Sequence, residues 1–135
     1  MKVFWLPVRV YLEDTDAQGV VYNASYFRFF ERARTDWLRE RGVDHGDLGV
    51  ELGLKLVLVS IEARFIAPGK LGDMLAVSAN LQEVKGAAGL FAQEIRRESS
   101  AGVLLAEATA RVACIDADSG RVRRWPKNIL ERLNR

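Results

Sequence analysis

The hydrophobic pattern of this chain changes its period along the sequence, and these changes predict its architecture. Residues 3–12 are rich in valine and aromatic residues, which predicts a strand with Pro7 near a sheet edge or at a bulge. From about Asn23 to Arg41, apolar residues recur at spacings of three and four, which predicts one long helix. After a connector at 43–53, the patterns become those of strands.

The predicted helix is amphipathic and is expected to be mostly buried. Its charged face includes Glu31 and Arg34, which stand three residues apart and are expected to pair at a surface or an interface. Asn23 or Ser25 is expected to cap its start, and Gly42 to end it. The apolar stripe, which two further aromatic residues broaden, comprises Tyr26, Phe27, Phe29, Phe30, Ala33, Trp37 and Leu38.

Turn residues divide the second half of the chain into further elements. The tail at 126–134 predicts a short terminal helix that Pro126 opens. Because no strand–helix–strand alternation appears, the order predicts an α+β fold in which one helix covers an antiparallel sheet. The 135 residues show no linker or repeat and suit a single domain, 1–135. The expected strands are 54–67, 72–84, 90–98 and 103–115.

Composition excludes several classes of site. A net charge of +2 is too small to indicate nucleic-acid binding. Cys114 is the single cysteine, so no disulfide can form within the chain. Together with His45, the single histidine, it cannot build a Cys/His zinc site, and we expect no bound metal. Cys114 lies in an apolar run and is expected to be a small buried hydrophobe, whereas His45 is expected to lie in a solvated loop.

The sequence predicts neither a signal peptide nor a membrane span. The apolar segment 1–7 is too short for a signal peptide, and no apolar run approaches the roughly 18 residues of a membrane span. We therefore expect a cytoplasmic protein in a reducing compartment.

One segment combines carboxylates, a glycine turn and a helix start. Asp14 and Asp16 follow the first strand, Gly19 allows a tight turn, and the helix begins at Asn23. Unpaired N–H groups at a helix start can stabilise an oxyanion, and a nearby carboxylate can attack a carbonyl or activate water. The same two aspartates are also typical turn formers, which is the alternative interpretation. A further role considered for Asp14 is to influence Asp16 by like-charge repulsion.

This segment closely resembles the 4-hydroxybenzoyl-CoA thioesterase family, in particular the branch of Tol–Pal-associated acyl-CoA thioesterases. The resemblance rests on YLEDTDAQGVVYNASY at 11–26 and FERART at 30–35. It continues through RFIAP at 64–68, AEA at 106–108, VACID at 112–116 and RWPK at 124–127, and so covers almost the whole chain.

The resemblance implies a hot-dog fold, with a long helix wrapped by a curved antiparallel sheet, and subunits that pair as homodimers or homotetramers. It implies hydrolysis of acyl-CoA with Asp16 as nucleophile or general base. Backbone N–H groups around Tyr22 and Asn23 would polarise the thioester carbonyl. It implies no cofactor, and an acyl carrier protein is a second partner to consider.

Asn23 departs from the related branch, in which a histidine usually stands at this place. An asparagine amide donates a hydrogen bond but is no base at neutral pH. The branch suggests short or medium acyl chains, with aromatic acyl groups as another option, and Arg123 and Arg124 are candidates for binding the phosphates of CoA. Two alternatives are a non-catalytic acyl-CoA or acyl-carrier-protein binder and a hydratase, which would need a histidine near the motif, whereas His45 lies outside it.

Overall fold

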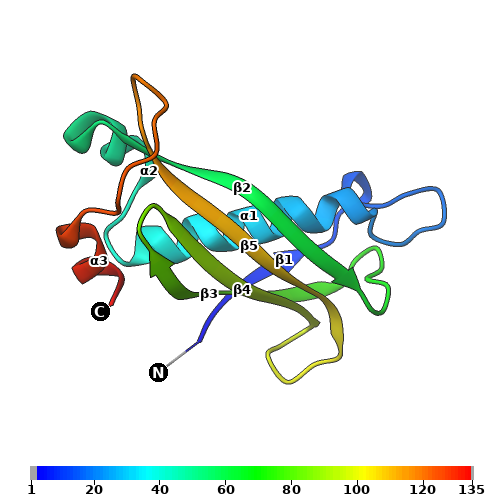
Figure 1. Ribbon diagram of the computed structural model, residues 1–135. Helices are drawn as coiled ribbons and strands as arrows, with labels where there is room; N and C mark the ends of the chain where they lie inside the picture. Colours follow the sequence, from blue (N-terminus) through cyan, green and yellow to red (C-terminus); the bar gives the residue numbers. More distant parts are fainter. Residues whose placement is uncertain (1–2, 135) are drawn as a thin grey trace.

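One long helix and a run of strands follow one another in the order that the hydrophobic pattern predicts (Figure 1). The computed structural model describes residues 3–134; residues 1, 2 and 135 lie outside it, and the first two belong to the segment considered above as a signal peptide. The elements are β1 (Phe4–Arg9), η1 (Leu12–Asp14), α1 (Asn23–Glu40), α2 (His45–Asp47), η2 (Leu48–Leu52), β2 (Leu54–Phe65), β3 (Met74–Lys85), β4 (Ala88–Arg97), β5 (Leu104–Asp116) and α3 (Lys127–Leu133).

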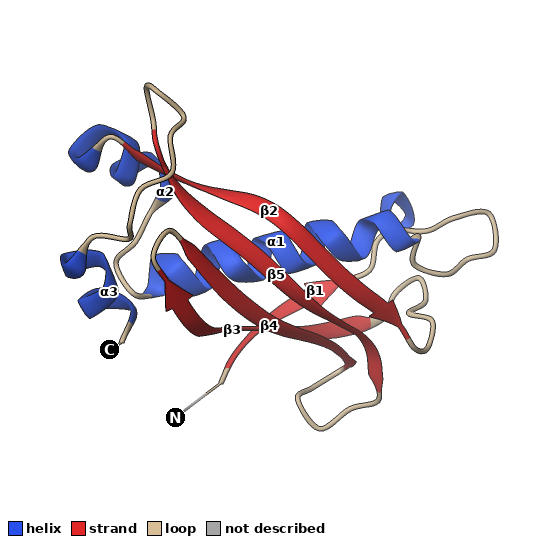
Figure 2. Cartoon of the chain, viewed as in Figure 1, coloured by secondary structure: helices blue, strands red, loops and turns tan. Residues whose placement is uncertain are grey.

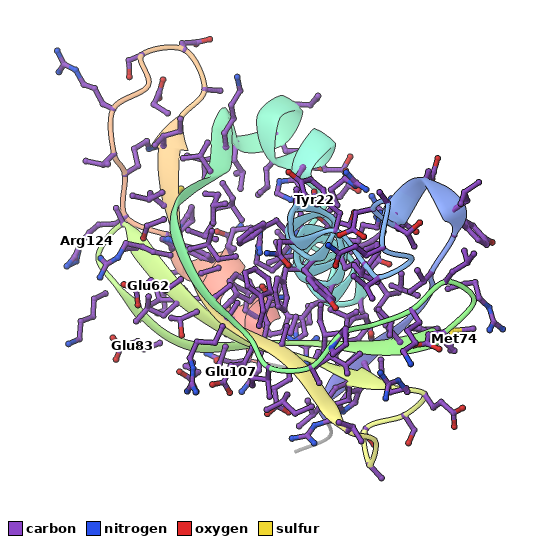
Figure 3. The ribbon with its side chains drawn as sticks, turned by 90° about the vertical axis from the view of Figure 1, so that its right-hand side faces the viewer. Tyr22, Glu62, Met74, Glu83, Glu107 and Arg124 are labelled. Atoms are coloured by element: carbon purple, nitrogen blue, oxygen red, sulfur yellow. The ribbon has the colours of Figure 1, made fainter. Side chains whose placement is uncertain are left out.

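The strands form one antiparallel sheet in the order β1-β3-β4-β5-β2. Figure 2 shows this sheet crossing α1, and the view along the helix in Figure 3 shows the sheet curling around it. Pro7 lies in β1, which is an edge strand, as its missing N–H requires. The prediction of an α+β hot-dog fold is confirmed.

The core lies between α1 and the concave face of the sheet. Phe29 and Phe30 of α1 are fully buried, so the predicted stripe is correct at these positions. Phe27 was wrongly assigned to the stripe, because it is 36% exposed and meets Phe65 edge to face, with ring centroids 6.0 Å apart. The sheet supplies fully buried side chains from Leu75, Val77, Phe91, Ile95, Leu105 and Ala110.

Arg34 was also wrongly placed, since it is buried and not on a charged surface. Its Nη1 donates to Oε1 of Gln93 at 2.9 Å, and Gln93 in turn donates to the carbonyl of Phe30 and to that of Ser78. No ion pair with Glu31 forms; Glu31 instead accepts from Thr35. Burial lowers the pKa of the Arg34 guanidinium. A polar side chain on β4 thus provides an acceptor inside the core that helical periodicity cannot reveal.

Three local predictions need correction. The first strand ends at Arg9, earlier than predicted, and Leu12 already belongs to the short helix η1. The connector at 43–53 contains α2 and η2. The connector turns helical because the Asp44 carboxylate accepts the N–H groups of Gly46 and Asp47. Neither Asn23 nor Ser25 caps α1, because Tyr22 holds the capping position and the Ser25 hydroxyl donates to the carbonyl of Asp14.

Cys114 lies as expected, and His45 is exposed as expected but belongs to a short helix and not to a loop. Cys114 is 1% exposed, and burial raises the pKa of its thiol. His45 is exposed in the short helix α2. Among the described residues, no helix is long and apolar enough to cross a membrane, and no group of three or more acidic, histidine or cysteine residues is arranged to hold a metal ion.

Candidate active site

Asp16 lies in a tight turn that leaves its carboxylate accessible. Its backbone N–H donates to the carbonyl of Val20, and its own carbonyl accepts the N–H of Gly19, both at 3.0 Å. Gly19 has a φ of 78°, which a side chain would strain. Oδ1 of Asp16 accepts the N–H of Gln18 at 2.8 Å, and within residues 3–134 no donor is recorded for Oδ2. One oxygen therefore shapes the turn, and the other is available for chemistry.

A second loop, residues 66–73, lies along the Asp16 turn and holds it. Val20 forms an isolated antiparallel bridge with Lys70, and the N–H of Val21 donates to the carbonyl of Gly69 at 2.8 Å. The N–H of Gly69 donates in turn to the hydroxyl of Tyr26 at 3.0 Å. A Cβ at Gly69 would come within 3.0 Å of Val21 Cγ2, so the two segments are packed closely. The turn is thus fixed to the sheet through β2 and β3.

The start of α1 presents unpaired backbone donors beside this turn. The N–H of Tyr22 is occupied, since it donates to the carbonyl of Asp14 at 2.9 Å. For Asn23 and Ala24, the next two residues, no acceptor of the N–H is recorded among the described residues. Tyr22, which is labelled in Figure 3 near α1, is 56% exposed. Of the two predicted donors, Asn23 is therefore the one whose N–H is free.

A cavity of about 210 Å³ opens next to these donors. Asn23 lines it together with Tyr26 and the end of β2, but Asp16 and Tyr22 do not. Burial raises the pKa of the Tyr26 hydroxyl, whose oxygen accepts the N–H of Gly69. The remaining walls are apolar or backbone and consist of Val20, Val21, Phe65, Ile66, Ala67 and Pro68.

Arg123 and Arg124 lie at the opposite end of the molecule. They precede α3, next to the end of α1, whereas the Asp16 turn precedes the start of α1 (Figure 1). The 18 residues of α1 span about 27 Å at a rise of about 1.5 Å per residue. Arg123 pairs with Asp116 at 3.6 Å, and Arg124 is exposed. One chain therefore does not bring this basic pair close to Asp16.

Larger hollows occur elsewhere on the surface. One of about 560 Å³ lies over the sheet, with residues from all five strands, and includes Glu62 and Glu107. One of about 530 Å³ lies between β1 and α1. Neither includes Asp16 or Asn23. We therefore assign the site by its donors and carboxylate. Sequence reasoning did not assign the residues of loop 66–73 to the site, although 66–68 belong to the RFIAP segment that carries the family resemblance.

Known proteins resemble this chain over almost its whole length. The family described as the thioesterase-like superfamily matches residues 10–133. The acyl-CoA thioesterase YbgC of Haemophilus influenzae is 42% identical over 126 residues, which cover 93% of this chain and 90% of that protein. The acyl-CoA thioester hydrolase YbgC of Escherichia coli is 39% identical over 128 residues, which cover 95% and 93%. The crystal structure of a 1,4-dihydroxy-2-naphthoyl-CoA thioesterase from Synechocystis superposes with a TM-score of 0.88 at 26% identity, covering 98% of this chain and 96% of that one.

Proposed function

Since this chain belongs to the thioesterase-like superfamily, we propose that it is an acyl-CoA thioesterase whose catalytic carboxylate is Asp16. The single observation that carries the assignment to this site is the exposed Asp16 turn, which precedes a helix start with free N–H groups and an adjoining cavity. Acyl transfer needs these parts: a carboxylate, oxyanion donors and room for the acyl group.

Asp16 acts by one of two routes, and the turn suits both. As a nucleophile, its free Oδ2 attacks the thioester carbonyl, the carbon–sulfur bond breaks, and CoA leaves as the thiolate. Water then hydrolyses the mixed anhydride and restores the carboxylate. As a base, the same oxygen removes a proton from a water that attacks the carbonyl; the carbon–sulfur bond then breaks, CoA leaves as the thiolate, and the proton passes from the carboxyl group to that thiolate. The bond from Gln18 to Oδ1 holds the carboxylate in one orientation for either step.

Asn23 supplies the oxyanion donor in this proposal. Its free backbone N–H lies at the positive end of the α1 dipole, which favours negative charge on the carbonyl oxygen. Asn23 also lines the cavity, and its side-chain amide can donate a second hydrogen bond. Tyr22 contributes less, because its N–H is bound to Asp14, so its role is limited to its exposed ring.

The open edge of β2 supports a paired molecule. β2 has 12 residues and pairs only with β5 among the described strands, and Leu58 and Val59 on it are 48% and 58% exposed. A long apolar edge strand is unstable as a free surface and tends to pair with another strand. We therefore propose a homodimer in which β2 pairs antiparallel with β2 of a second copy; stacking of two such dimers would give a tetramer.

Such a pair also gives Arg123 and Arg124 a function. Antiparallel pairing about a two-fold axis sets the end of β2, beside the Asp16 turn, against the start of the partner's β2. The start of β2 lies near α3, where the basic pair precedes that helix (Figure 1). We propose that these two arginines reach the CoA phosphates of the site in the second copy, where guanidinium groups bind phosphate well.

Turnover of a panel of acyl-CoA substrates tests the function. The panel runs from acetyl to palmitoyl and adds benzoyl and 4-hydroxybenzoyl, and a second set carries the same acyl groups on acyl carrier protein. Asp16→Asn is expected to lose at least about 100-fold in kcat with unchanged folding. The matched control is Asp118→Asn, an exposed aspartate in the turn after β5, which should keep wild-type turnover.

The outcomes separate the candidate functions. Turnover that depends on Asp16 supports the thioesterase and ranks the acyl groups. Turnover confined to the carrier-protein set makes acyl carrier protein the partner. Binding without turnover on every substrate would favour the non-catalytic binder, with Asn23 in place of the usual histidine as the first residue to test.

A further inference from the structure

Asp14 is enclosed by polar partners. It is only 4% exposed, and Oδ2 of its carboxylate accepts the N–H of Tyr11 at 2.9 Å. Oδ1 faces Nη2 of Arg28 at 3.4 Å. The same Nη2 donates to the hydroxyl oxygen of Ser25 at 3.0 Å, and this hydroxyl donates to the carbonyl of Asp14 at 3.0 Å. The three residues Asp14, Ser25 and Arg28 thus form a closed ring, here called the Asp14 clamp.

The Asp14 clamp joins the two ends of the loop that carries Asp16. Asp14 is the last residue before the loop at 15–21, and its carbonyl accepts the N–H of Tyr22 at 2.9 Å. Ser25 and Arg28 belong to the first turns of α1, which also carry the free N–H of Asn23. The clamp therefore fixes the start of the helix relative to the loop.

On the premise of the proposed thioesterase function, we propose that Asp14 is a positioning residue for that reaction. Through Ser25 and Arg28 it holds the Asp16 carboxylate at a set distance from the Asn23 N–H. Both groups must act on one carbonyl, the carboxylate at carbon directly or through the attacking water and the N–H at oxygen. A misplacement of about 1 Å in such an arrangement costs about 100-fold in rate.

The Arg28 contact of the clamp is suited to fixing orientation and contributes little to global stability. The Arg28 side chain is 52% exposed and its contact with Asp14 is long, and such pairs stabilise a fold weakly. Loss of the Arg28 contact should therefore appear in kcat, while KM and the unfolding temperature change little. A residue that only supported the fold would show the reverse.

Steady-state kinetics of Asp14→Asn and Arg28→Gln test the proposal, with Glu13→Gln as the matched control. Glu13 is the preceding carboxylate in η1 and is exposed, so its replacement makes the same change of charge outside the clamp. We expect kcat to fall about 10- to 100-fold in Asp14→Asn with KM within about two-fold of wild type, and less in Arg28→Gln. Glu13→Gln should stay within about two-fold of wild type. The double variant should be no slower than Asp14→Asn alone, because the two residues act as one unit.

Several results would overturn the proposal. One is an equal fall of kcat in Glu13→Gln, which would indicate a general charge effect. Another is a shift of the acid limb of the pH–kcat profile at an unchanged plateau, which would indicate repulsion between the two aspartates. A third is a kcat of the double variant Asp14→Asn/Arg28→Gln that falls by the product of the two single losses, which would mean that the two residues act independently. If Asp14→Asn does not fold, Arg28→Gln carries the test alone.

Amide hydrogen exchange keeps the proposal separate from the function on which it rests. If the wild type hydrolyses no acyl thioester, the proposed function fails, but the clamp is still measurable. Exchange at residues 15–24 should be about ten-fold faster in Asp14→Asn and Arg28→Gln than in wild type or Glu13→Gln. Unchanged exchange in both clamp variants would show that the loop is held without Asp14.

Discussion

The hydroxyl of Tyr26 connects helix α1 to the loop that holds the Asp16 turn, and its removal allows a test with a defined magnitude. In Tyr26→Phe, the N–H of Gly69 loses its acceptor at 3.0 Å, in a place that is buried on both sides. A buried donor without a partner costs about 1–3 kcal/mol. The ring itself remains, so its packing on Phe29 and Phe65 is preserved.

This loss of free energy of unfolding can be converted into a fall in the unfolding temperature, Tm. For 135 residues, an unfolding entropy of about 2.1 cal/mol/K per residue gives about 0.28 kcal/mol/K. The expected fall in Tm is therefore about 4–11 °C, measured by calorimetry or circular dichroism at fixed protein concentration. The control is Tyr11→Phe, which removes the hydroxyl of a tyrosine that is 63% exposed and should change stability by less than about 0.5 kcal/mol.

The stabilities of wild type and Tyr26→Phe should respond differently to pH. Burial raises the folded-state pKa of Tyr26 above its usual value of 10.0. A raised pKa contributes stability that is complete below about pH 10 and is lost as the pH rises through the folded-state pKa. The difference in stability between wild type and Tyr26→Phe should therefore narrow in strong alkali. A Tm within about 1 °C of wild type at neutral pH would refute the reasoning, because it would mean that Gly69 finds another acceptor at no cost.

Three further predictions concern other parts of the chain. The Cys114 thiol is buried, and burial raises its pKa, so it should react with a thiol reagent only after denaturation. Titration of the thiol with and without guanidinium measures this. Rapid reaction of the native protein would contradict the prediction. Leu58→Lys on the open edge of β2 should convert the dimer to a monomer, as measured by light scattering. The control Leu71→Lys changes another exposed leucine and should leave the dimer intact. A dimer that persists in Leu58→Lys would exclude pairing through this edge. A hydrogen bond from Arg39 and two from the backbone N–H groups of Gly46 and Asp47 lower the pKa of Asp44 below its usual 3.8. The ionised Asp44 carboxylate therefore contributes stability above about pH 4, and this contribution is lost as the pH falls through the lowered pKa. Asp44→Asn should therefore be less stable than wild type at pH 7 and equal to it in strong acid, and a constant difference at both pH values would argue against the assigned cap.

Local sequence determined the elements of this protein and the position of its motif. Helix α1 and the four strands that follow it appear within a few residues of their predicted bounds, because each is encoded by the spacing of its own apolar residues. Burial of Cys114 followed in the same way from its apolar neighbours. The segment from Asp14 to Asn23 stood out because it places carboxylates, a glycine and a helix start close together in the chain.

Only the tertiary structure decided which of these groups are free and which are bound. Tyr26 meets Gly69 across 43 positions, and Arg34 meets Gln93 across 59, so neither contact leaves a trace in local periodicity. The same is true of the bond that occupies the N–H of Tyr22 and leaves that of Asn23 available. Apolar spacing records which face of an element is buried, whereas the partner of each polar group depends on segments that the fold brings together from distant parts of the chain.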